Sequence, residues 1–227
     1  MPSRDVRTRL VRRAAKANLF LADGLADRLT AYYELLLRWN RKINLTSIDN
    51  VDEAVDRLLL EPLAAVRHFP PGVKRLMDVG SGGGSPAIPF KLALPDVALT
   101  MVEVKARKSA FLREAIRQLQ LKGADVENAR FEELLARPEL HEAYDLLSVR
   151  AVRAEARVLT SLQAFLKSGG SMVLFRGPEG AAHPPSVVPP LEWSGTFPLV
   201  ESLQSRVTLL AKRHIGAAAM RTQASGL

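Results

Sequence analysis

The stretch RLMDVGSGGGSPAIPF, residues 75–90, decides the fold of this chain. Its first five residues read as a short buried strand, and glycines follow at once at positions 80, 82, 83 and 84. An apolar segment containing Pro86 and Pro89 then enters a predicted helix over residues 86–94. Glycines tolerate positive φ and let a backbone approach a ligand closely. A strand, a glycine-rich turn and a helix in this order predict a cradle for a ligand.

Two ligand patterns fit this turn, and a third interpretation needs no ligand. Gly82-x-Gly84-x-x-Ala87 matches the dinucleotide pattern with alanine in its last place. Asp78-x-Gly80-x-Gly82-x-Gly84 is a better fit to the first nucleoside loop of methyltransferases that use S-adenosylmethionine. That cofactor carries a positive sulfonium and no pyrophosphate. A plain tight turn is the alternative, although four glycines in five residues sacrifice conformational entropy that such a turn does not require.

Length, composition and charge narrow the class of protein. The 227 residues suit one α/β domain with an extension, and 47% apolar with 25% charged residues is ordinary for a soluble protein. The sequence has no apolar run that could span a membrane and no secretory signal, so we expect a cytoplasmic protein. Cysteine is absent and the four histidines are scattered, which argues against a metal site. The net charge of +8 favours a polyanionic partner such as nucleic acid, with a basic solvated surface as the alternative.

Residues 1–72 are predicted to form a basic N-terminal arm and a helical extension. The six basic residues within 1–22 fit a helix or a mobile arm along phosphates, or else a frayed terminus. A helix beginning near Asp23 carries apolar residues on one face, with Arg38 and Lys42 elsewhere. Asn50 opens a second helix as an N-cap, and Pro62 is predicted to kink or end it. Prolines 70 and 71 with a glycine at 72 mark the boundary to the main domain.

The main domain, residues 73–215, alternates strands and helices, which predicts a largely parallel sheet. Helices are expected over 105–121 and after the fourth strand, the latter burying Leu159, Leu162 and Leu166. Residues 177–192 hold five prolines and are predicted to be a loop, and 216–227 a mobile tail. Strands are predicted at 75–79, 98–103, 125–129, 144–149, 171–176, 196–202 and 205–212.

Ligands of open α/β sheets bind outside the carboxyl ends of the strands, where side chains at four positions are candidates. Glu103 ends the second strand at the position of a ribose-binding carboxylate, or else is an acid at a helix N-terminus. Phe131 is positioned to stack on adenine, with Glu132 or the backbone reading its edge, unless Phe131 belongs to the core. Arg150 ends the fourth strand and would face the methyl donor and the substrate; a surface arginine is the alternative. Arg176 ends the fifth strand and follows the same reasoning.

Several motifs in order resemble one family, the bacterial methyltransferases that modify guanine N7 of small-subunit (16S) ribosomal RNA, also called glucose-inhibited division protein B. The segment at 39–48 together with the glycine turn is far more specific for this family than the turn alone. The matching segments are WNRKINLTSI at 39–48, LMDVGSGGGSPAIP at 76–89, VEVKARKSAFLRE at 102–114, ARFEEL at 129–134, SVRAV at 148–152, LFRGP at 174–178 and RVTLLAKR at 206–213.

The resemblance implies an α/β fold of Rossmann-like class I, with a seven-stranded, mostly parallel sheet behind an N-terminal helical extension. It implies S-adenosylmethionine as cofactor and 16S ribosomal RNA, in the small subunit or an assembly particle, as partner of a monomeric enzyme. Arg38, Lys42, Arg150 and Arg176 are candidates for RNA contact, and no residue is assigned as a catalytic base. The candidate cofactor-binding residues are Gly80, Ser81, Gly82, Gly84, Ser85, Glu103, Phe131, Glu132 and Arg150.

This chain departs from the family pattern at several positions. Ser85 stands where an aromatic or aliphatic residue is usual, which predicts weaker packing against the cofactor. Arg176 replaces a common lysine, and Ala87 replaces a glycine. Leu58, Glu61 and Pro62 stand where the family commonly shows His, Asp and Ser. Two rival functions are kept: a nicotinamide-dependent oxidoreductase, and a non-catalytic RNA-binding protein of ribosome assembly.

Overall fold

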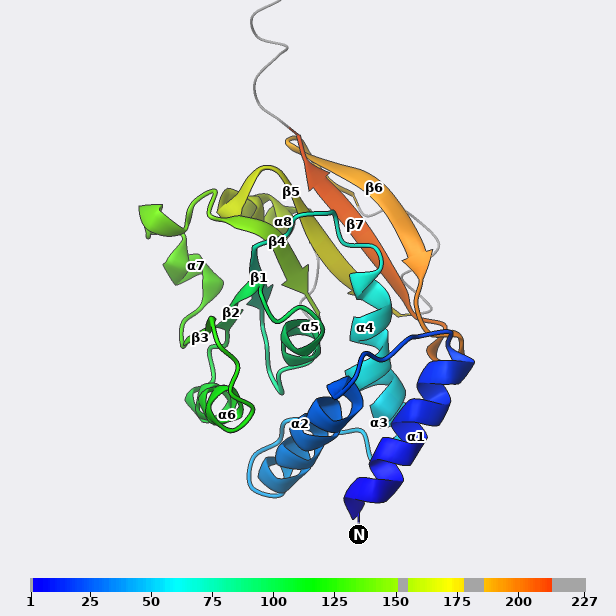
Figure 1. The fold of residues 1–227 in the computed structure, drawn as a ribbon. Coiled ribbons are helices and arrows are strands. Elements are labelled where there is room, and N and C mark those ends of the chain that lie inside the picture. Colours follow the sequence, from blue (N-terminus) through cyan, green and yellow to red (C-terminus); the bar gives the residue numbers. More distant parts are fainter. Residues whose placement is uncertain (1, 151–154, 178–185, 214–227) are drawn as a thin grey trace, which may run out of the picture.

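The computed structural model describes residues 2–150, 155–177 and 186–213, with side chains from residue 5 (Figure 1). Seven strands form one sheet in the order β3-β2-β1-β4-β5-β7-β6. Neighbours among β1 to β5 pair in parallel, and β7 pairs antiparallel with both β5 and β6. This confirms the predicted Rossmann-like, mostly parallel sheet. The strands are β1 Arg75–Val79, β2 Ala98–Val102, β3 Ala124–Glu127, β4 Tyr144–Val149, β5 Leu166–Arg176, β6 Leu191–Pro198 and β7 Arg206–Lys212.

Helices cover both faces of the sheet because alternate strand residues bury their side chains on opposite sides. On one face the apolar cluster runs from Leu76 of β1 through helices α5 and α6 to the N-terminal helices, and on the other Met77 packs with α8 (Figure 1). The boundary predicted at 70–72 does not interrupt the first apolar cluster, which contains residues from both sides of it. The helices are α1 Pro2–Lys16, α2 Leu25–Asn40, α3 Val51–Val55, α4 Glu61–Val66, α5 Ala87–Ala93, α6 Ala106–Gln118, α7 Phe131–Leu134 and α8 Ala156–Leu162.

The N-terminal arm is a packed helix. Val6, Leu10 and Ala14 recur at a spacing of four residues on one face of α1, and all three are buried. Arg9 pairs with Asp52, and Arg13 with Asp52 and Asp56, so aspartates of α3 and of the helical turn that follows it hold these two arginines. Of the alternatives for residues 1–22, the structure therefore selects a helix that is part of the core.

Four sequence predictions for the elements need correction. Helical structure continues past Pro62, because a five-residue π-helix, Asp56–Leu60, precedes α4 and proline sits in the first turn, where its missing N–H is not needed. Leu166 begins β5, since a 3₁₀ turn over Gln163–Phe165 ends the preceding helix. Strand β6 begins at Leu191, inside the segment predicted as loop, and Glu103 follows β2 directly. The tail 216–227 lies outside the described residues.

Asn50 caps α3 as predicted, because its Oδ1 accepts a hydrogen bond from the backbone N–H of Glu53 at 3.0 Å. The side chain of Asn40 also satisfies backbone groups, accepting from the N–H groups of Leu45 and Thr46 at 2.8 and 2.9 Å. Asn40 thereby fixes the loop after α2 against the glycine turn. None of the helices in the described residues is both long and apolar enough to cross a membrane.

Candidate functional site

The glycine turn between β1 and α5 is held at the carboxyl edge of the sheet. Gly80, Gly82 and Gly84 have φ values of 79°, 53° and 86°, which side chains with a Cβ rarely adopt. The N–H groups of Gly80 and Ser81 donate to the carbonyl of Val102 at 2.9 and 3.0 Å. This pair of bonds ties the turn to the end of β2 and brings it beside the residue that follows that strand.

The glycines of the turn serve two different purposes. A Cβ at Gly83 would lie 3.1 Å from the carbonyl oxygen of Leu45 and 3.3 Å from Leu36 Cδ1, and one at Gly84 would lie 2.5 Å from Ile88 Cδ1. These two glycines are therefore required by packing within the protein. A Cβ at Gly82 would meet only the Gly80 carbonyl, at 3.8 Å, so this position faces open space. Gly82 is the glycine that leaves room for a ligand.

Glu103 points at the glycine turn. One carboxylate oxygen accepts from the N–H of Gly82 at 2.9 Å and the other from the N–H of Lys105 at 2.7 Å, and the residue is buried. The second contact makes Glu103 an acid at the start of α6, as the structural alternative predicted, while the first places its carboxylate beside Gly82. Each carboxylate oxygen accepts one of these bonds and retains capacity for another donor, such as a ribose hydroxyl.

Asp78 is a second acid at this edge, and the sequence argument gave it no role. Its side chain is buried; Oδ1 accepts a hydrogen bond from Ser148 Oγ, whereas Oδ2 has no partner among the described groups. Burial raises the pKa of Asp78 to about 6, and the hydrogen bond from Ser148 opposes that rise. A buried carboxylate oxygen without a donor among the described groups, in the strand that leads into the glycine turn, fits a cationic ligand group. An acidic residue inside the apolar run Leu76–Val79 was the available signal.

Arg150 lies at the end of β4 and reaches back to the helical extension. Its guanidinium donates to Ser85 Oγ at 3.0 Å and to the carbonyl of Arg57 at 2.9 Å, forms an ion pair with Glu61, and lies over the ring of Phe175. The surface alternative for Arg150 is therefore wrong. Glu61 was recognised only as a departure from the family pattern, although an acid in the run LLLEPLAA signals a buried partner.

Ser85 is a polar link in this cluster. Its hydroxyl donates to the carbonyl of Leu58 at 2.9 Å and accepts from Arg150. From the other side of the turn, Tyr32 Oη donates to the carbonyl of Gly83 at 2.7 Å, and burial raises the pKa of Tyr32. The helical extension thus contributes Tyr32, Glu61 and two carbonyl groups to the surroundings of the glycine turn.

The remaining predicted site residues lie at different distances from this centre. Phe131 begins α7 and is half-buried against the second apolar cluster, which satisfies the core alternative in part, and Glu132 is exposed beside it. Arg176 ends β5, two strands from β1 on the same edge. Arg38 contacts Gln118 near the far end of α6 at 3.3 Å, away from the glycine turn, and Lys42 is exposed.

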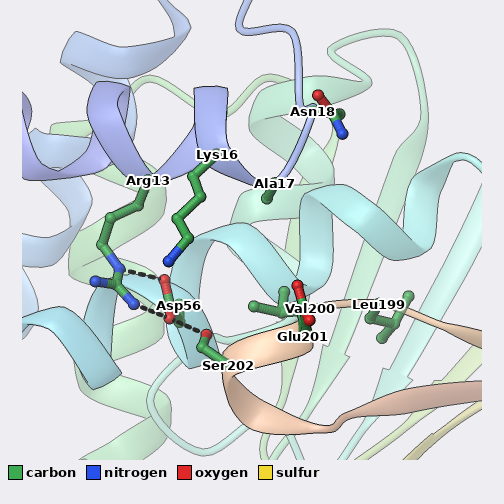
Figure 2. Close-up of a pocket in the computed structure, with 9 residues that line it drawn as sticks. All are labelled: Arg13, Lys16, Ala17, Asn18, Asp56, Leu199, Val200, Glu201 and Ser202. Carbon is green, nitrogen blue, oxygen red and sulfur yellow. Dashed lines mark hydrogen bonds and ion pairs between the residues drawn. The ribbon is translucent and has the colours of Figure 1, made fainter.

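A separate hollow of 460 Å³ lies where the end of α1 meets the π-helix and the turn at 201–203 (Figure 2). Asp56 projects toward it from the π-helix and binds Arg13 and Ser202, while Lys16 extends along its rim (Figure 2). Asp56 is already satisfied by these partners, so it is not a group that needs a ligand in this hollow. Across the described side chains, no group of three or more His, Asp or Glu residues is arranged to hold a metal ion.

Comparison with known proteins adds to this geometry. A family model described as rRNA small subunit methyltransferase G matches residues 26–183. The ribosomal RNA small subunit methyltransferase G of Xylella fastidiosa strain 9a5c is 38% identical over 189 residues, which cover 82% of this chain and 83% of the relative. The protein of the same name from Syntrophotalea carbinolica is 34% identical over 178 residues, covering 78% and 81%.

Solved structures share the fold at low sequence identity. A putative O-methyltransferase from Klebsiella pneumoniae has a TM-score of 0.60 and 17% identity, covering 89% of this chain and 98% of that one. A point mutant of MtNAS in complex with S-adenosylmethionine has a TM-score of 0.55 and 14% identity, covering 85% and 80%. At these identities the likeness concerns the fold alone.

Proposed function

Because this chain belongs to the family of rRNA small subunit methyltransferase G, it is an S-adenosylmethionine-dependent methyltransferase, and we propose that it methylates N7 of a guanine in 16S ribosomal RNA. The substrate particle is a small subunit or its assembly precursor, the enzyme acts as a monomer, and a ribosomal substrate puts the reaction in the cytoplasm. The observation that carries the proposal is the buried Asp78 carboxylate in the strand that leads into the glycine turn, one oxygen of which has no partner among the described groups.

The charges around the turn favour S-adenosylmethionine over a nicotinamide dinucleotide. Asp78 places a buried carboxyl group in the strand that leads into the turn, close to where a dinucleotide would place its negative pyrophosphate, whereas Glu103 at the ribose position is compatible with either cofactor. S-adenosylmethionine instead carries an ammonium and a sulfonium, and like charges repel whereas opposite charges attract. In the proposed complex, Asp78 accepts from the cofactor ammonium, Glu103 accepts from the ribose hydroxyls, and Phe131 lies against adenine with Glu132 or its backbone at the adenine edge.

The proposed reaction requires the protein to align the two reactants and does not require a catalytic base. S-adenosylmethionine supplies a methyl group activated by its sulfonium, and guanine N7 offers a lone pair at neutral pH and loses no proton on attack. Holding two reactants in line is worth many orders of magnitude in rate. Arg176, at the end of β5, is suited to hold the RNA backbone near the glycine turn, whereas the buried ion pair of Arg150 with Glu61 replaces the phosphate contact that the sequence led us to expect of Arg150.

The pattern of ion pairs indicates where RNA approaches. Arg9 and Arg13 of α1 are taken up by aspartates, whereas Arg41 and Lys42 after α2, and Lys105 and Arg107 at α6, form no ion pair within the described part of the chain. Both of these segments border the glycine turn. The carbonyl of Leu45 lies close to Gly83, and the backbone N–H of Lys105 donates to the Glu103 carboxylate. We infer that phosphates contact these two segments, whereas Arg9 and Arg13 of α1 are held within the protein.

The test is methyl transfer by the full chain. Purified protein with S-adenosylmethionine is incubated with small subunits, assembly particles or naked 16S RNA, each from cells lacking this modification, and RNA nucleosides are analysed by mass spectrometry. We expect 7-methylguanosine from at least one ribosomal substrate and none from isolated guanosine. RNA binding without methyl transfer would support the assembly-protein alternative, and thermal stabilisation by NAD but not by S-adenosylmethionine would support the oxidoreductase.

A further inference from the structure

Arg150 is a buried cation at the place where the proposed reaction brings a second cation. Its side chain is 16% exposed and that of Glu61 is 2% exposed, so water contributes little to solvating either charge. A guanidinium stays protonated in proteins, so burial leaves the charge in place. Under the proposed function, the sulfonium of the cofactor would be repelled by Arg150 if that charge were uncompensated.

Glu61 is the acid that compensates it. It is the only ion-pair partner of Arg150 among residues 5–150, 155–177 and 186–213. The other contacts of the guanidinium, to Ser85 Oγ and the Arg57 carbonyl, are uncharged. The neutral pair keeps a rigid, planar hydrogen-bond donor at the end of β4 while adding little net positive potential to the site.

The π-helix before α4 makes this arrangement possible. In it the N–H of Glu61 bonds to the carbonyl of Asp56, five residues back, and the carbonyls of Arg57 and Leu58 accept from Arg150 and Ser85. The same helical stretch thereby presents one buried acid, Glu61, to the glycine turn and another, Asp56, to Arg13 on the side shown in Figure 2.

We propose that Glu61 is a positioning residue for methyl transfer, the counter-charge that lets Arg150 lie at the methyl-donor end of the cofactor site without repelling the sulfonium. This inference rests on the proposed function, because it requires a cationic cofactor at the glycine turn. It also assigns a purpose to the extension: the segment before β1 completes the electrostatics of the cofactor site.

The charge argument is tested by comparing two ligands of the same shape. S-adenosylmethionine carries the sulfonium, whereas S-adenosylhomocysteine, which lacks the methyl group, has a neutral sulfur. Isothermal titration gives both dissociation constants for wild type, Glu61→Gln and Glu61→Asp. We expect Glu61→Gln to raise the ratio of the S-adenosylmethionine constant to the S-adenosylhomocysteine constant by roughly tenfold. Glu61→Asp, which keeps the charge, should retain a ratio near the wild-type value.

Asp56→Asn is the matched control, because it disrupts another ion pair of the same helical stretch, one that does not involve Arg150. It should lower the melting temperature and leave the ratio unchanged. Ser85→Ala removes an uncharged partner of Arg150, so any loss of affinity should affect both ligands equally. A merely structural role for Glu61 would likewise weaken both ligands together.

An unchanged ratio in folded Glu61→Gln overturns the inference. If that variant does not fold, Arg150→Met at pH 8.5 replaces it: the carboxylate then faces the sulfonium alone, the ratio should fall below wild type, and no fall overturns the inference. Wild-type protein that binds neither ligand would contradict the proposed function itself, which distinguishes the two failures.

Discussion

Replacing Asp78 with asparagine should remove a loss of stability that wild type suffers as pH rises through 6, while weakening the protein's hold on the cofactor. Asp78 is 1% exposed, and one of its carboxylate oxygens has no donor among the described residues. Burial raises its pKa from 3.8 to about 6 in the folded protein, so the fold favours the protonated form. The free energy of unfolding therefore contains a contribution that is present below pH 4 and is lost as pH rises through 6.

The size of that contribution follows from the displacement of the pKa. A rise from 3.8 to about 6 spans about two pH units, and each unit corresponds to about 1.36 kcal/mol, which gives about 3 kcal/mol. Asparagine is neutral at every pH, so the free energy of unfolding of Asp78→Asn does not fall by this amount as pH rises. Its amide adds donors that lack partners, at a cost of about 1–3 kcal/mol, but that cost is independent of pH.

Urea denaturation of both proteins from pH 4 to pH 8 measures the difference in free energy of unfolding. Asp78→Asn should gain on wild type by about 3 kcal/mol between pH 4 and pH 7. Asp145→Asn is the control and should lose stability relative to wild type as pH rises. Despite partial burial, Lys167 and two backbone N–H groups lower the pKa of Asp145, so its ionised form stabilises the fold. A difference between Asp78→Asn and wild type that stays constant with pH would refute the reasoning. Titration calorimetry should show weaker binding of S-adenosylmethionine by Asp78→Asn.

Two further predictions concern the turn and the RNA surface. Gly83→Ala should lower the free energy of unfolding by about 1–3 kcal/mol, because its Cβ meets the Leu45 carbonyl, and should bind the cofactor normally once folded. Gly82→Ala should lower the free energy of unfolding by about 1 kcal/mol, because alanine disfavours the positive φ at this position, and should also weaken cofactor binding. Equal cofactor binding by the two variants would contradict the assignment of Gly83 to packing and Gly82 to the ligand. In RNA binding at increasing salt, Arg107→Ala should reduce the slope of log K against log salt by about one, whereas Arg9→Ala should not; the reverse result would place the RNA on α1.

Local patterns predicted the fold well because strands, turns and amphipathic helices are encoded by neighbouring residues. Residues 144–149 form β4 with the predicted bounds, and the strand at 75–79 followed by glycines is β1 and its turn. The family resemblance is confirmed by the family model over residues 26–183. The exact ends of other elements were less accurate: β6 starts five residues before the predicted strand, because its pairing with β7 overrides the weak local signal.

The sequence predicted only part of the site. Glu103 was found because a ribose-binding acid follows the second strand at a regular spacing, and the contact with Gly82 agrees with that position. Glu61 was missed as a partner of Arg150, which is 89 residues away along the chain. Ser85 was judged a weaker packing residue, whereas its hydroxyl joins Arg150 to the π-helix.

The sequence by itself therefore determined the order of the main features along the chain: a glycine turn after the first strand, an acid after the second and an arginine after the fourth. Only the tertiary structure decided which charges neutralise one another, that α1 uses Arg9 and Arg13 internally, and that Asp78 keeps an oxygen without a donor among the described groups. The physical reason is range. Backbone propensity and periodicity act over a few residues, whereas the solvation and pairing of a charge depend on whichever distant segment the fold brings against it.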